Sequence, residues 1–172
     1  MTDDFATLYA RTAQSAASIL TNLAELESAI ADLEQKIGGL PFFVRGFVSS
    51  QVSKGTGQDV PAWNKTIKAL TATLRQVQEA AGNAGAGAPS AADRTLYTTA
   101  RGQIDDSRPR LEKLASFMES VPSKLGAIPP GLLQDDQRGE FLQAVAQQTQ
   151  ALRGALAEMP TLSTALKGLS GE

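Results

Sequence analysis

The sequence contains neither cysteine nor histidine. Without cysteine, the chain has no disulfide framework and no thiolate ligand for a metal ion. Without histidine, it has no Ser-His-Asp or Cys-His catalytic site and no imidazole ligand. The Glu-x-x-His pairs that hold iron in ferritin-like bundles are excluded for the same reason. Any catalytic or metal-binding site in this chain must therefore use carboxylates.

Adjacent acids are the remaining candidates for binding Mg²⁺ or Ca²⁺. The pairs are Asp3-Asp4, Asp105-Asp106 and Asp135-Asp136. Acids near helix starts are favoured by the helix dipole alone, so these pairs need no ligand to explain them. The Glu-x-x-Glu and Asp-Asp-x-x-Asp patterns of helical metal-dependent enzymes do not occur. We therefore expect a non-catalytic protein without metal or cofactor, and a carboxylate-only, magnesium-dependent enzyme is a lesser alternative.

Long apolar runs and strong net charge are also missing. No run approaches the ~20 residues needed to span a bilayer, and the first residues, "MTDDFATLYARTAQ", do not resemble a signal peptide. We expect a cytoplasmic, bacterial protein. The net charge is −2, and the bases of residues 38–81 can complement the acids of residues 1–37 in antiparallel packing. This balance predicts no binding to nucleic acid.

What the sequence does contain is a sustained heptad pattern, with apolar positions separated by alternating steps of four and three residues. The first seam runs from Phe5 to Ile37 and predicts a helix of roughly 50 Å at 1.5 Å per residue. Further seams run from Val60 to Ala81, from Tyr97 to Leu125 and from Phe141 to Leu169. Four such seams predict an all-α fold, an elongated four-helix bundle with coiled-coil-like heptad packing.

The helix boundaries follow from capping residues and breakers. Asp59 is placed to cap the second long helix, and Ser90 with Asp93 matches a capping box before the third. Between them, "GNAGAGAPS" at residues 82–90 predicts a flexible linker within one domain spanning residues 1–172. "GAIPPG" is expected to end the third helix. Pro109 predicts a kink in that helix, and Pro160 predicts either a kink or a fresh helix start.

Aromatic residues are scarce, at 5% of the chain, yet three of the six phenylalanines fall within "LPFFVRGFVSSQVSK" at residues 40–54. We expect a short helix here, beginning at Pro41 and ending near Lys54. Its apolar residues form a candidate capping or interaction surface: Phe42, Phe43, Val44, Phe47, Val48 and Val52. Our leading prediction is that Phe43 and Phe47 cap one end of the bundle. The alternatives are contact with a partner protein or a second copy, and insertion into a lipid or granule surface.

Three polar residues, Thr12, Ser107 and Gln148, occupy seam positions. Polar residues at such positions often set the register or the oligomeric state of a bundle. The long seams and the alanine-rich helix faces predict a helical interaction or scaffold protein. The first helix is much longer than the helix at residues 59–81, so part of its seam has no equal-length neighbour unless the short aromatic helix or another subunit supplies one, and we expect a homo-oligomer, most simply a dimer. The alternative is an amphipathic coat protein on a membrane face or hydrophobic granule. Its long helices without catalytic residues resemble the granule-coating phasins in architecture alone.

Overall fold

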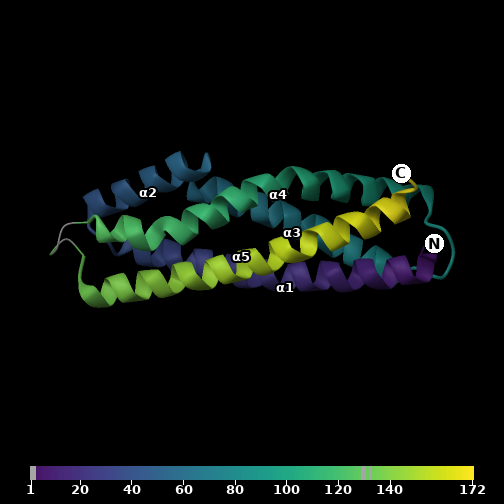
Figure 1. The fold of residues 1–172 in the computed structure, drawn as a ribbon, viewed down its shortest axis with the longest axis horizontal. Helices are drawn as coiled ribbons and strands as arrows, with labels where there is room; N and C mark the ends of the chain where they lie inside the picture. The colour runs from purple at the N-terminus through teal and green to yellow at the C-terminus, as the bar shows by residue number, and fades with distance from the viewer. Residues whose placement is uncertain (1–2, 129–130, 132) are drawn as a thin grey trace.

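The computed structural model describes residues 3–128, 131 and 133–172, and every element within these residues is helical or a turn. The helices are α1 (Phe5–Gly38), α2 (Phe42–Thr56), α3 (Val60–Gly82), α4 (Ala91–Gly126) and α5 (Asp135–Ser170). The prediction of an elongated all-α bundle is confirmed (Figure 1). Part of "GAIPPG" lies outside the described residues, but α4 ends at Gly126 as the motif predicts.

The four long helices form a ring in which α1 contacts α5 and α3, and α4 also contacts α5 and α3. The ring encloses one continuous apolar core. Predicted seam residues such as Ile67, Leu74, Ile104 and Leu152 are fully or almost fully buried. The heptad pattern predicts this core well because a residue at each a and d position must face the partner helices.

The capping residues act as their positions predict. The Asp59 carboxylate accepts a hydrogen bond from the Ala62 backbone N–H at 2.8 Å, and the Ser90 hydroxyl accepts one from the Asp93 N–H at 3.1 Å. The linker that joins α3 to α4 is tied to α1, since the Tyr9 hydroxyl donates a hydrogen bond to the Gly87 carbonyl.

The prolines do not divide the helices that contain them. α4 runs through Pro109 and Pro122, and α5 runs through Pro160, so a fresh start at Thr161 is wrong. All three prolines are exposed. A carbonyl that loses its helical partner to a proline can therefore be hydrated, which lowers the cost of an interior proline.

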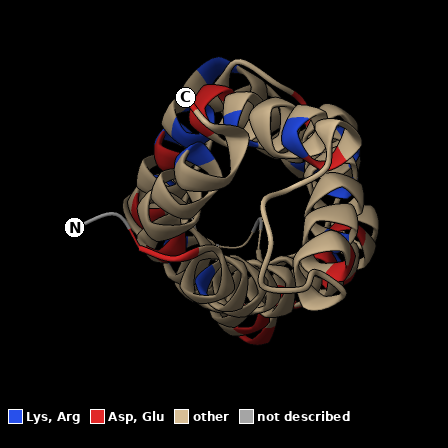
Figure 2. Ribbon diagram, turned by 90° about the vertical axis from the view of Figure 1, so that its right-hand side faces the viewer, with Lys and Arg blue, Asp and Glu red and all other residues tan. Residues whose placement is uncertain are grey.

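Charges are spread over the helices around the ring (Figure 2). The acids of α1 do not form ion pairs with the bases of α3 within the described residues. Instead, Asn64 and Thr71 of α3 donate hydrogen bonds to Glu34 and Glu27 of α1. The ion pairs between helices join other neighbours: Lys36 of α1 with Glu140 of α5, and Arg153 of α5 with acids of α4.

The end of the bundle at the α1–α2 turn is built differently from the rest. α3, with 23 residues, is shorter than α1, α4 and α5. Along the stretch that α3 does not reach, α2 covers the bundle, chiefly through contacts with α4 (Figure 1). The candidate functional residues described below, on α2 and around the cavity beside it, all lie at this end of the bundle.

Candidate functional site

α2 carries apolar residues on two faces. Val44 and Val48 are buried against the bundle, whereas the Phe42, Phe43 and Phe47 side chains are 82%, 57% and 43% exposed. The prediction that Phe43 and Phe47 cap the core is therefore wrong for Phe43 and holds only for part of the Phe47 ring. The two valines thus face the bundle, and the larger rings of Phe42 and Phe43 turn outward.

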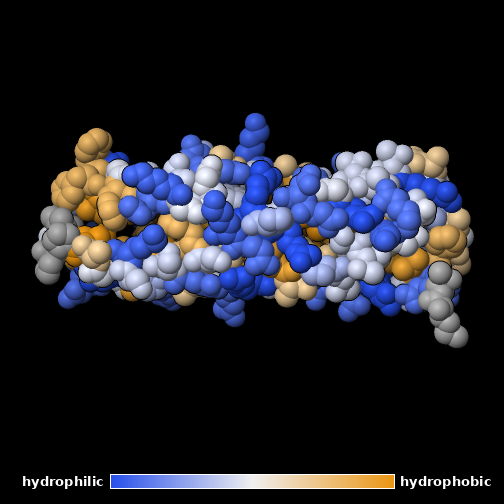
Figure 3. Space-filling view, turned by 45° about the horizontal axis from the view of Figure 1, so that its top comes forward, coloured by the Kyte–Doolittle hydropathy of each residue, from blue (hydrophilic) through white to orange (hydrophobic). Residues whose placement is uncertain are grey.

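The outer face of α2 changes character along its length. Its first turns present Phe42 and Phe43, with the Arg45 guanidinium 6.0 Å from the centre of the Phe42 ring. Its later turns present small exposed residues: Gly46, Ser49 and Ser53. In the space-filling view, apolar side chains gather at the end of the molecule where α2 lies (Figure 3). We call this outer face, residues 42, 43, 46, 49 and 53, the α2 surface.

The corner between α2 and α3 is held by a buried hydrogen bond. The Trp63 indole N–H donates to the Thr56 hydroxyl oxygen at 2.9 Å, and both side chains are buried. Between the two helices Gly57 adopts φ of 80°, a left-handed conformation that glycine accepts readily. Just before it, Gly55 faces the Phe117 ring of α4 so closely that a Cβ would overlap the ring. These contacts fix the position of α2 relative to α3 and α4.

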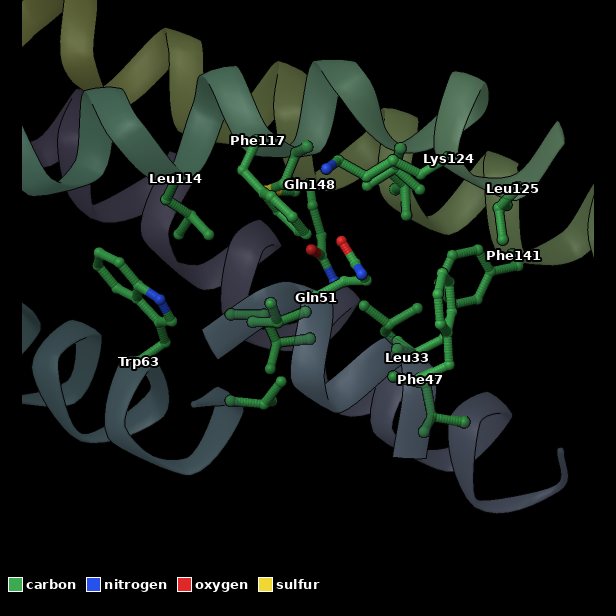
Figure 4. A pocket seen from close by; sticks show the side chains of 18 residues that line it. Leu33, Phe47, Gln51, Trp63, Leu114, Phe117, Lys124, Leu125, Phe141 and Gln148 are labelled. Atoms are coloured by element: carbon green, nitrogen blue, oxygen red, sulfur yellow. The ribbon is translucent and has the colours of Figure 1, made fainter. Parts of the chain in front are cut away.

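An apolar cavity of about 80 Å³ lies between α2 and the remaining helices. Figure 4 shows it with Trp63 near one end and Phe141 near the other. Its walls come from all five helices, with residues such as Leu33 of α1, Phe47 of α2, Trp63 of α3, Phe117 of α4 and Phe141 of α5. The cavity exists because α2 takes the place of α3 here without reaching as far into the ring.

The polar groups of this cavity are few. Gln148 of α5 is only 4% exposed, and its side-chain amide nitrogen has no hydrogen-bond partner within the described residues. Figure 4 shows the amides of Gln148 and Gln51 directed into the space between α2 and α4. Lys124 of α4 also lines the cavity, with its ammonium 5.3 Å from the centre of the Phe117 ring.

The sequence indicated this cavity only in part. Trp63 lies on the predicted seam from Val60 to Ala81 and is buried in the core as a seam residue should be, but it also lines the cavity. Gln148 was singled out as a polar seam residue and interpreted as a determinant of register. The contributions of Phe117 and Lys124 were missed. One signal for the cavity was available in the sequence. Gln148 is a polar residue on an apolar seam, and it lies near the end of the bundle that the short helix α3 does not reach.

The other polar seam positions are buried as well. Thr12 is fully buried and Ser107 is 3% exposed, as expected of seam residues. The Thr12 hydroxyl has no hydrogen-bond partner within the described residues, and the same is true of the buried Tyr97 hydroxyl. Burial raises the pKa of Tyr97 to about 12, because the phenolate would be poorly solvated there. These groups lie in the core and offer no open site.

The acid pairs occupy positions that explain them structurally. Asp4 caps α1 and accepts a hydrogen bond from the Thr7 N–H, which lowers the pKa of its carboxyl group. Asp105 accepts a hydrogen bond from the Ser163 hydroxyl at 2.8 Å. Asp135 and Asp136 lie in the first turn of α5. Among residues 3–128, 131 and 133–172, no cluster of three or more acids could hold a metal ion.

Comparisons of the chain with protein-family models, with curated proteins and with solved structures find no match. No described helix combines the length and apolar character needed to cross a membrane. The arguments for function therefore rest on the α2 surface and on the cavity beneath α2.

Proposed function

We propose that this chain is a non-catalytic helical interaction protein that self-associates through the α2 surface. Phe42 and Phe43 are the large apolar side chains most exposed to solvent among the described residues. Exposed aromatic residues are enriched at protein interfaces, where they contribute much of the binding energy. A helix with apolar residues on both faces is stabilised when both are covered, and the bundle covers one of them.

The observation that carries this proposal is the self-complementary pattern of the α2 surface. One half presents two phenylalanine rings, and the other half presents Gly46, Ser49 and Ser53, which are small and exposed. In an antiparallel pair of α2 helices, the rings of each copy lie over the small residues of the other. A two-fold symmetric contact requires this kind of pattern, because the same patch must serve both partners.

The exposed area sets the expected strength of the contact. At ~150–250 Å² for an aromatic side chain, the exposed parts of Phe42 and Phe43 amount to about 200–350 Å². A stable interface buries about 800 Å² per partner. The two rings thus supply roughly a quarter to two-fifths of such an interface, and the remainder must come from the small half of α2 and its surroundings. This predicts a reversible dimer that dissociates on dilution.

Light scattering over a range of concentrations tests this proposal. The wild type should shift from its monomer mass of 18.1 kDa towards twice that value as concentration rises. The double variant Phe42→Ser/Phe43→Ser should stay monomeric. Ser53→Glu should also prevent association, because it places a charge beneath the partner's rings. The matched control is Ser123→Glu on the exposed side of α4, which should dimerise normally. A wild type that remains monomeric at all concentrations refutes the proposal.

A lipid or granule surface is the second candidate for covering α2. It is favoured by the charges, since α2 carries Arg45 and Lys54, and no acid occurs between Glu34 and Asp59. Basic residues beside exposed aromatic rings suit an anionic interface. Co-sedimentation with vesicles of anionic phospholipid tests this candidate. Surface coating would replace self-association as the proposed function if two results are obtained together. The wild type would bind the vesicles and stay monomeric in solution, and the Phe42→Ser/Phe43→Ser variant would no longer bind them.

A further inference from the structure

We propose that α2 is a hinged strap, which detaches from α4 as a unit while the ring of four long helices stays folded. In the open form, the inner face of α2 and the walls of the cavity become accessible to a binding partner. The proposal concerns the movement of α2 and does not depend on what covers its outer face.

Polar contacts hold α2 to the bundle less firmly than they hold the long helices to one another. Ion pairs join α5 to α1 and to α4, and hydrogen bonds join α3 to α1. Among the described residues, the side chains of residues 42–55 form no hydrogen bond or ion pair with another helix. The remaining polar link is the hydrogen bond between Thr56 and Trp63 at the corner. Apolar contact therefore holds most of α2 in place.

This apolar contact is incomplete. Val44 and Val48 are buried and Val52 is half-buried, but the cavity of about 80 Å³ leaves part of the inner face of α2 without neighbouring atoms. Missing neighbours forfeit dispersion energy, so such a segment opens at a lower free energy than a closely packed one. The Gln148 amide nitrogen adds to this effect, because it lacks a hydrogen bond while α2 is closed and meets water when α2 detaches.

Glycine residues lie at both ends of α2. Gly38 ends α1, and Gly57, with φ of 80°, joins α2 to α3. At either residue, a Cβ would meet nothing within 4 Å. Because glycine accepts a wide range of backbone angles, both residues can absorb the rotation that a hinge requires. The long helices on either side of α2 need not unfold when it opens.

Hydrogen exchange followed by NMR tests whether α2 opens as a unit, at a protein concentration low enough to keep the chain monomeric. The amides from Val44 to Val52 should share one protection factor, at least about tenfold lower than that of α3 seam residues such as Ile67 and Leu74. Fraying would instead give protection that changes steadily along the helix. Graded protection in α2, or protection equal to that of α3, would overturn the proposal.

The absence of cysteine from the chain allows a second measurement. Val121→Cys places a thiol in the cavity wall beneath α2, and Val77→Cys is the matched control at a fully buried position of α3. A thiol reagent should modify Val121→Cys at least about tenfold faster than Val77→Cys, because only the first becomes accessible when α2 opens. Equal rates would show that α2 leaves only when the whole bundle unfolds, which contradicts the proposal.

Two further changes separate opening from static exposure and from global unfolding. Thr56→Val removes the corner hydrogen bond and should speed the modification of Val121→Cys about tenfold. Leu166→Ala truncates a fully buried residue near the end of α5 that lies away from α2 (Figure 1). It should speed the modification of Val77→Cys and leave Val121→Cys unchanged, because it destabilises the closed and open forms alike. If Thr56→Val has no effect on Val121→Cys, or if Leu166→Ala speeds both reactions equally, the proposal is wrong.

Discussion

The two ends of this bundle follow different packing rules. Where α1, α3, α4 and α5 run together, apolar seam residues such as Ile67 and Leu152 are completely buried. Where α2 replaces α3, the seam residues Leu33 and Ile37 of α1 are only half-buried, and a cavity remains. The difference shows that a heptad seam buries its residues only where a helix of matching length lies opposite.

The two ends also differ in the groups that they offer to a binding partner. The well-packed region has no exposed aromatic residue among the features described above, and its unpaired Thr12 and Tyr97 hydroxyls are enclosed in the core. The α2 end has exposed rings outside, an unpaired amide inside and a glycine–aromatic contact at its corner. Proteins place binding sites where packing is incomplete, because a completely packed region has no surface or space left for a ligand.

The largest effect is expected from a truncation in the well-packed region. Leu152→Ala should lower the free energy of unfolding by about 2–5 kcal/mol, since it removes a fully buried side chain and leaves a cavity. The contrasting variant, Phe42→Ala at the α2 end, should change the stability of the monomer by no more than about 0.5 kcal/mol. Denaturant unfolding at low protein concentration measures both. Equal losses would show that the two ends are packed alike.

The next effect sharpens the contrast within α2 itself. Gly55→Ala should destabilise the protein by about 1–3 kcal/mol, because the added methyl group overlaps the Phe117 ring and forces α2 away from α4. Gly46→Ala on the same helix meets nothing within 4 Å and should stabilise it by about 0.5–1 kcal/mol. Thermal unfolding of the pair provides the measurement. A stabilising Gly55→Ala would mean that α2 is not seated closely on α4.

A somewhat smaller loss is expected at the corner between α2 and α3. Thr56→Val keeps the shape of the side chain but removes the acceptor of the Trp63 indole N–H. Leaving that buried donor unpaired should cost about 1–2 kcal/mol and shift the Trp63 fluorescence. Thr73→Val is the control, because the Thr73 hydroxyl donates to the Ala69 carbonyl of its own helix and has no other hydrogen bond among the described residues. An unchanged fluorescence spectrum in Thr56→Val would argue against this corner contact.

The smallest effect concerns pH and the ion pairs between α4 and α5. The Glu119 carboxylate accepts two hydrogen bonds from Arg153, which lower its pKa below the ordinary value of 4.5. Because the folded state then holds fewer protons, this stabilisation is present above about pH 4.5 and is lost as the pH falls through the lowered pKa. In the Glu119→Gln variant, the free energy of unfolding should therefore fall slightly less steeply as the pH is lowered below about 4.5. An identical plot would show that the exposed pair contributes nothing.

Much of the fold and little of the site could be predicted from the sequence. The heptad seams identified the four long helices and their buried residues, because the spacing of apolar residues alone decides which face of a helix must be covered. Capping by Asp59 and Ser90 was equally local, since each side chain bonds to a backbone group three residues away. The short helix at residues 42–56 was also visible from its proline start and apolar content.

The orientation of α2 was decided by tertiary structure. Its valines and its phenylalanines are both apolar, so periodicity could not say which set would face the bundle, and the leading prediction for Phe43 was wrong. The choice follows from how closely Gly55 lets α2 approach Phe117, and from the Thr56–Trp63 hydrogen bond. Likewise, Gln148, Lys124 and Trp63 come together only because α3 is too short to fill the ring. The sequence by itself determines local pattern, whereas a cavity depends on the lengths and angles of helices that are far apart in the chain.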